Sequence, residues 1–169
     1  GRSVSMVKED ITPWLVQVIE QIQDSQGITV TQDLSRPLPP VPHDQEKMRR
    51  VVINVLYNAI QAVRAKTAAA NGGSVDYHPN IKIKTHHVHD QVILSIADNG
   101  VGMDPKTLQR AFEPLFTTRA RGTGIGLAIV KKIVNEHGGS VSLKSVVGEG
   151  TQVTIALPRA VAPKTGTGK

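Results

Sequence analysis

Residues 51–59 read Val51-Val52-Ile53-Asn54-Val55-Leu56-Tyr57-Asn58-Ala59, and their apolar positions recur at the spacing of an α-helix. The pattern predicts a helix over about residues 45–66, with Asp44 as its N-cap. One broad face of this helix is apolar and needs another apolar surface to cover it. The residues on that face are Met48, Val52, Val55, Leu56, Ala59 and Val63.

The sequence on both sides of this helix predicts two further helices and several strands. Helices are expected at 13–26, between the N-cap Thr12 and the terminating Gly27, and at 124–137. Alternating apolar residues predict strands at about 4–11, 28–34, 81–86, 92–96, 140–147 and 151–157. Adjacent hairpins exclude an all-parallel sheet. We therefore expect a two-layer α/β (α+β) sandwich: a mixed, mostly antiparallel sheet of about five strands, with about three helices on one face.

The composition fits one domain with an aliphatic core. Of 169 residues, 39% are hydrophobic but only 3% are aromatic, and there is no cysteine. The net charge of +6 comes from Lys and Arg spread along the chain, and with so few stacking aromatics it does not favour nucleic acid as a partner. No apolar run approaches the roughly 18 residues of a membrane span. We assign 8–158 to the domain, 1–7 to a linker end and 159–169 to a disordered tail.

Asn54 and Asn58 lie four residues apart and so share one face of the predicted helix. Asparagine is a poor helix former, so two of them in an apolar helix need a reason. Their amide oxygens could point into a pocket, where one neutral oxygen suits Mg²⁺, which keeps several waters and substrate phosphate oxygens. Alternatively, they are buried amides paired with backbone.

Asp98 ends a predicted strand and is followed by Asn99-Gly100-Val101-Gly102. A carboxylate at this point can accept a hydrogen bond from an exocyclic amine such as adenine N6, and the glycines allow backbone to approach a flat ring. The alternative is an Asn-Gly hairpin turn, although no clear strand follows Gly102.

Gly122, Gly124 and Gly126 alternate and lead into the helix near residue 124. Free amides at such a helix start bind phosphate, although a simple glycine hinge would also fit. The dinucleotide fingerprint and the Walker pattern both fail here. The preceding segment, 103–123, has little periodicity and is long enough to be a functional lid.

The six histidines are predicted to lie on the surface. His87 and His89 could meet a metal on one strand face, but no carboxylate or cysteine stands at a suitable spacing.

Taken together, these motifs resemble the ATP-binding catalytic domain of sensor histidine kinases, within the GHKL (Bergerat-type) ATPases. Residues 51–59 resemble the N box, 98–102 the first glycine box, 112–119 the F box and 122–127 the second glycine box. The likeness covers nearly the whole of 8–158. It implies a mobile ATP lid at 103–123 and the cofactors ATP and Mg²⁺.

The resemblance also implies roles for particular residues. Asn58 would hold Mg²⁺, Asn54 would assist at the phosphates, and Arg119 would act at the γ-phosphate, so these three are the predicted catalytic residues. Asp98, backed by Thr151, would bind the adenine amine. The full set of implied ATP-binding residues is Asn54, Asn58, Asp98, Gly100, Gly102, Met103, Thr118, Arg119, Gly122, Thr123, Gly124, Ile125, Gly126, Leu127 and Thr151.

Two departures refine the implied activity. ATP-hydrolysing relatives carry glutamate where Asn54 stands, and an amide cannot act as that base, which favours phosphoryl transfer. Gln61 stands where many of these kinases have lysine near the phosphates.

The implied acceptor is a histidine on a separate helical dimerisation domain, since His43-Asp44 does not continue the acceptor motif. A response regulator receiver domain would be the next partner. We expect a monomeric, cytoplasmic fragment, and the sequence leaves open whether its parent is anchored in a membrane. Two alternatives stay open: a serine/threonine kinase resembling anti-sigma factors, and a non-catalytic nucleotide-binding module.

Overall fold

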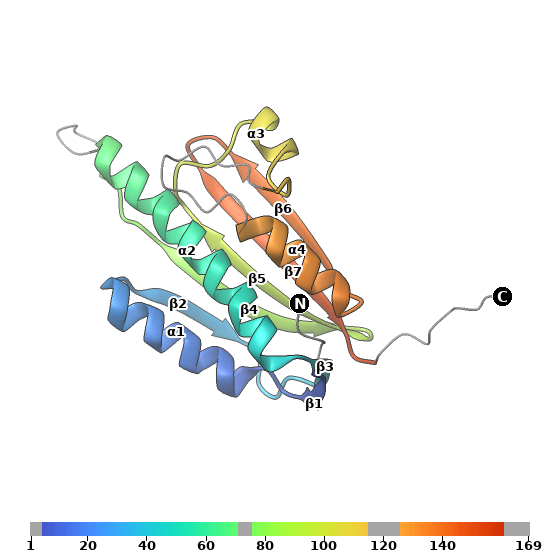
Figure 1. Cartoon of the computed structure of the whole chain (residues 1–169). Helices are drawn as coiled ribbons and strands as arrows, with labels where there is room; N and C mark the ends of the chain where they lie inside the picture. Colours follow the sequence, from blue (N-terminus) through green and yellow to red (C-terminus); the bar gives the residue numbers. More distant parts are fainter. Residues whose placement is uncertain (1–4, 71–75, 115–125, 161–169) are drawn as a thin grey trace.

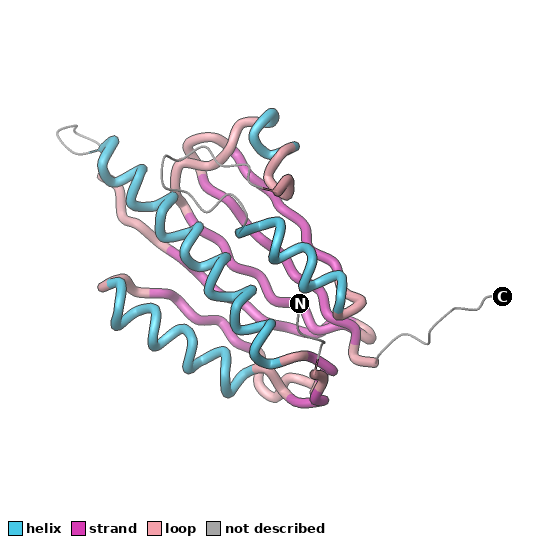
Figure 2. Tube along the Cα trace, in the orientation of Figure 1, coloured by secondary structure: helices cyan, strands magenta, loops and turns pink. Residues whose placement is uncertain are grey.

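The computed structural model describes residues 5–70, 76–114 and 126–160, and the elements in these ranges form two layers (Figure 1). The strands of the main sheet are β2 (Val30–Leu34), β4 (Ile81–Val88), β5 (Gln91–Asp98), β6 (Ser140–Val146) and β7 (Gly150–Pro158). The helices across one face are α1 (Thr12–Gln26), α2 (Gln45–Ala70) and α4 (Gly126–Glu136), with a short α3 (Pro105–Gln109) at one end. Figure 2 shows the helices lying over the strands, which confirms the predicted sandwich.

The main sheet has the order β2-β4-β5-β7-β6, with β2 and β4 parallel and every other pair antiparallel. The prediction of one mixed, mostly antiparallel, five-stranded sheet is therefore confirmed. Its register places Asp98, the last residue of β5, opposite Ile81 of β4 and Thr151 of β7. This corner of the sheet carries the predicted base-binding residues.

Helix α2 runs across the middle of the sheet and packs against both α1 and α4. All six predicted core residues of this helix are buried. Asp44 caps its first turn, because Oδ1 accepts a hydrogen bond from the Lys47 amide at 3.0 Å. The helix ends at Ala70 rather than near residue 66, because alanines at 68–70 favour helix over the expected linker.

The start of α1 differs from the prediction. Thr12 is the first helical residue and not the N-cap, a position that Ile11 occupies. The carboxylate of Asp10 accepts a hydrogen bond from the Thr12 amide at 2.8 Å. A neighbouring acid therefore provides the acceptor that was expected from the threonine hydroxyl. Gly27 ends the helix in a left-handed conformation, as expected.

A second, two-stranded sheet joins β1 (Val7–Glu9) to β3 (Val41–His43) in antiparallel pairing. The first strand was expected within 4–11, but its partner was missed because prolines at 39, 40 and 42 indicate an extended connection rather than a strand. β3 leads directly into the Asp44 cap, so this small sheet determines where α2 begins.

Two histidines are buried near the N-terminal end of α2, which contradicts the prediction of surface histidines. His43 is 0% exposed and its Nε2 accepts from the Trp14 indole N–H at 3.0 Å. His137 is 5% exposed, and its Nε2 accepts from the Asp44 amide at 2.9 Å. Hydrogen-bonding partners compensate for the burial of both rings. Across the described residues, no group of three or more His, Cys, Asp or Glu gathers for a metal, so the pairing of His87 with His89 gains no support.

None of the helices in the described ranges has both the length and the apolar character needed to cross a membrane.

Candidate functional site

The first part of the predicted site is the middle of α2. Asn54 and Asn58 are both half-buried there, one helical turn apart. Gln61, three residues further on, is half-buried too, and its Oε1 atom is buried without a hydrogen-bond partner. A buried carbonyl oxygen without a donor costs free energy unless something else supplies that donor. This part of the helix therefore has a polar atom that a ligand or ordered water would satisfy.

The second part is the loop after β5. Asp98 is half-buried, and its Oδ1 accepts from the Gly100 amide at 2.8 Å, which makes a tight turn at the strand end. Residues 99–104 belong to no strand and lead into α3, so the hairpin alternative is wrong. Asn99 holds the loop to the start of β4, because its side-chain oxygen accepts from the Asn80 amide at 2.8 Å.

This loop lies directly against α2. A side chain at Gly100 would overlap the backbone and Cβ of Ala62, so only glycine permits the approach. The Val101 amide donates to the Ala62 carbonyl at 3.3 Å. Ala62 is one helical turn after Asn58. The structure thus brings the two predicted halves of the site, the asparagines and the first glycine loop, into neighbouring positions. That Asn58 and Asp98 face one shared cavity stays a prediction.

A hydroxyl pair joins the loop to the β6–β7 hairpin. Ser145 Oγ accepts from the Met103 amide at 2.8 Å and lies 2.7 Å from Thr151 Oγ1. Asp98, Gly100, Gly102, Met103 and Thr151 are therefore gathered at one corner of the sheet. Ser145 was missed by the sequence reasoning, although the expected hairpin around residues 148–150 already placed it opposite Thr151.

The predicted lid is only partly described. Its first part contains α3, whose N-cap Asp104 accepts from the Thr107 amide at 2.7 Å; this bond lowers the pKa of the Asp104 carboxyl. The ring of Phe112 lies 5.2 Å from the Lys131 ammonium of α4. Gly126 is the buried first residue of α4 and Leu127 packs against the core. The predicted residues outside the described ranges are Thr118, Arg119, Gly122, Thr123, Gly124 and Ile125.

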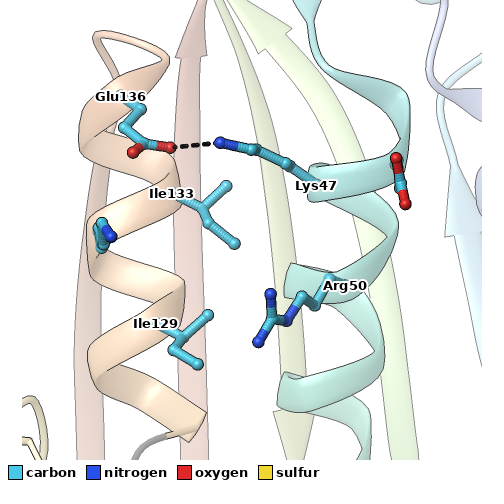
Figure 3. A pocket seen from close by; sticks show the side chains of 7 residues that line it. Lys47, Arg50, Ile129, Ile133 and Glu136 are labelled. Atoms are coloured by element: carbon cyan, nitrogen blue, oxygen red, sulfur yellow. Dashed lines mark hydrogen bonds and ion pairs between the residues drawn. The ribbon is translucent and has the colours of Figure 1, made fainter. Parts of the chain in front are cut away.

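A separate groove of about 410 Å³ lies between the first turns of α2 and the stretch of α4 from Ile129 to Glu136 (Figure 3). The Lys47 ammonium pairs with the Glu136 carboxylate across it at 3.3 Å, and Ile129 and Ile133 form its apolar side. Of the predicted nucleotide-binding residues that the structure describes, none lines this groove.

Comparisons with known proteins identify the family of this chain. Residues 43–161 match the family described as histidine kinase-, DNA gyrase B- and HSP90-like ATPase. This match covers more than half of the chain, and the chain belongs to that family. Its similar sequences include histidine-protein kinase AtoS of Escherichia coli, 37% identical over 75% of this chain and 19% of AtoS. Sensor histidine kinase ZraS of Salmonella typhimurium is 32% identical over 88% of the chain and 30% of ZraS.

Solved structures show the same fold. Full-length ShkA in complex with AMPPNP aligns with a TM-score of 0.75 and 26% identity, over 96% of this chain and 33% of ShkA. The catalytic domain of histidine kinase ThkA aligns with a TM-score of 0.74 and 23% identity, over 92% of this chain and 97% of that domain. The chain thus corresponds to the ATP-binding catalytic module of sensor histidine kinases, and it spans about a fifth to a third of the length of the curated relatives named above.

Proposed function

We propose that this domain binds Mg-ATP and donates the γ-phosphoryl group to a histidine on a separate helical dimerisation domain of its parent protein. The observation that carries the proposal is the close contact between the Gly100 loop and α2. Because of this contact, the loop that follows Asp98, the residue proposed to bind adenine, lies beside the helix that carries Asn54 and Asn58. A response regulator receiver domain would then take the phosphoryl group from the histidine. The fragment itself would act as a monomer.

The side chains of Asp98, Asn58 and Gln61 fit the chemistry of a magnesium nucleotide. The Asp98 carboxylate can accept from the adenine amine while its Oδ1 keeps the Gly100 turn closed. Asn58 offers an amide oxygen of the kind that Mg²⁺ accepts, and the metal would neutralise charge between the phosphates. The Gln61 oxygen next to these asparagines supports a ligand there, because no group among the described residues donates a hydrogen bond to it.

The proposed reaction is phosphoryl transfer rather than hydrolysis. Asn54 stands where a base would activate water, and an amide takes no proton at neutral pH. The contribution of the protein would then be mostly positioning and electrostatic stabilisation. Arg119 is proposed to act at the γ-phosphate and the glycines of 122–126 to present backbone amides to the phosphates.

Nucleotide binding is tested by calorimetric titration of Mg-ATP into Asp98→Asn and Asn58→Asp variants. Asp98→Asn keeps an oxygen for the Gly100 amide but loses the charge, so the fold should persist while most affinity is lost. Asp33→Asn, on the exposed surface of β2, is the matched control and should bind like the wild type. Wild-type affinity in both site variants would reject the site.

Phosphoryl transfer is tested by mixing the domain and labelled ATP with a separately supplied helical histidine domain. Acid-labile label on that domain supports the proposal, because phosphohistidine is acid-labile and phosphoserine is not. Acid-stable label would favour the serine/threonine kinase alternative. Binding without any transfer would favour a non-catalytic module.

A further inference from the structure

Lys66 makes two contacts near the C-terminal end of α2, and neither was anticipated from the sequence. Its ammonium donates a hydrogen bond to the Gly148 carbonyl at 2.6 Å. The same ammonium lies 4.8 Å from the centre of the Tyr77 ring, within the range of a cation–π interaction. One side chain thus connects the helix to the β6–β7 turn and to the segment that precedes β4.

Both contacts lead to the loop after β5. The Tyr77 hydroxyl lies 3.0 Å from the Asn99 carbonyl oxygen and 3.1 Å from Asn99 Oδ1. The Gly148 amide donates to the Val101 carbonyl at 2.7 Å. Lys66 therefore reaches positions 99 and 101 by two independent routes, on either side of Gly100.

The hydroxyl of Tyr77 stays protonated under ordinary conditions and so can remain a donor. Burial, followed by the negative charge of Asp98, raises the pKa of this phenol above its usual value. The two oxygens of Asn99 thus face a neutral O–H.

The position of Lys66 along α2 sets it apart from the predicted metal end of the site. It stands eight residues after Asn58, about 12 Å further along the helix axis at 1.5 Å per residue. The turn that it holds at Gly148 is three residues from Thr151, which pairs with Asp98 across the sheet. Its contacts are therefore at the base end of the proposed site.

We propose that Lys66 and Tyr77 form a clamp that positions the base-binding loop of the nucleotide site. Lys66 is a positioning residue that acts through Gly148 and Tyr77 without touching the nucleotide. The inference rests on the proposed function and deepens it, because it assigns affinity for the base to contacts outside the family motifs.

The test compares Lys66→Met, which keeps most of the stem but loses the charge and the donors, with Lys66→Arg, which keeps both. Dissociation constants for Mg-ATP and Mg-ADP are measured by calorimetry, and thermal unfolding is followed in parallel. We expect Lys66→Met to weaken both nucleotides by the same factor of about five, as expected for one partly exposed charged contact. Lys66→Arg should recover most of this loss.

Lys82→Met is the matched control, because the Lys82 side chain is 45% exposed, lies 3.9 Å from Asp33 and stands on the face of β4 opposite the buried Ile81 and Ile83. Both nucleotides should bind it as they bind the wild type. Tyr77→Phe is a second probe that removes only the hydroxyl, and it should weaken ATP and ADP equally, by less than Lys66→Met. It keeps the test valid if Lys66→Met lowers the melting temperature.

The outcomes separate this inference from the function on which it rests. Wild-type binding by both Lys66→Met and Tyr77→Phe would overturn the clamp and leave the proposed function standing. A loss that is larger for ATP than for ADP and disappears at high salt would also overturn it, since that result indicates direct phosphate contact. A wild-type domain that binds no nucleotide would reject both proposals together.

Discussion

The two ends of α2 are held in opposite ways. At the N-terminal end, Asp44 is 2% exposed, its amide donates to His137 in a buried bond, and its carboxylate makes the partly buried cap bond. At the C-terminal end, Lys66 holds Gly148 and Tyr77 through partly exposed contacts. Asn54 and Asn58 lie between the two ends. The helix that carries them is therefore fixed by buried contacts at one end and by more exposed contacts at the other.

The difference teaches which substitutions should affect folding and which should affect ligand binding. A buried polar group that loses its partner keeps its full desolvation cost, whereas an exposed group exchanges its partner for water. We therefore expect damage at the N-terminal end to lower the free energy of unfolding. Substitutions at the C-terminal end should change the position of the loop after β5 and leave the free energy of unfolding nearly constant.

The largest expected effect is from Asp44→Ala. This change removes the cap of α2 and leaves the amides of Lys47 and Ser5 without their carboxylate acceptor. We expect the free energy of unfolding to fall by about 2–4 kcal/mol, the sum of a lost cap and an unsatisfied donor. Chemical denaturation measures the change. Asp104→Ala, which removes the exposed cap of α3, is the control and should cost much less, because water can replace the lost acceptor. Equal losses in both variants would break the comparison.

An intermediate effect is expected from mild acid. Burial is the main cause that lowers the pKa of His137 below 6.5, and nearby His43 lowers it further, although the Ile133 carbonyl, Asp44 and Glu136 act in the other direction. A base whose pKa is lower in the folded state takes up protons more readily when unfolded. The His137 contribution to stability should therefore be constant above pH 6.5 and fall as the pH drops from 6.5 towards the folded-state pKa.

The His137 contribution is isolated by comparison with His137→Gln. Glutamine can accept the Asp44 N–H without titrating, so its stability should depend less on pH between 6.5 and 5. Denaturant midpoints at several pH values measure both slopes. Parallel slopes would assign the acid sensitivity to other groups.

The smallest expected effect on stability is from Tyr77→Phe, at the other end of α2. The hydroxyl is partly exposed, so water can replace its bonds to Asn99. We expect a loss of less than about 1 kcal/mol in denaturant unfolding. A loss as large as that of Asp44→Ala would show that both ends of the helix are stability anchors.

Local patterns in the sequence predicted most of the fold. The spacing of apolar residues indicated α2 and its buried face, and Asp44 and Gly27 marked helix ends, because caps depend on contacts within a few residues. The strand alternation at 81–86 and 92–96 matches an antiparallel pair in the structure. The family motifs added site residues, whose roles stay predictions.

Errors arose at one helix start, where a neighbouring acid replaced the expected cap, and at positions where a partner distant in sequence decided burial or pairing. The N-cap of α1 was assigned to Thr12 although Asp10 provides the acceptor, and two histidines expected on the surface are buried. The strand at Val41–His43 was missed because its partner, β1, lies more than 30 residues earlier in the sequence.

What the sequence determined by itself is most of the elements, their order and a set of candidate residues for a metal nucleotide, because periodicity, caps and turns are encoded over short distances. Only the tertiary structure decided that Asp44 meets His137, 93 residues away, and that Lys66 meets Gly148, 82 residues away. Such contacts depend on how helices pack across the sheet, and neither residue of a pair carries a local sign of its partner.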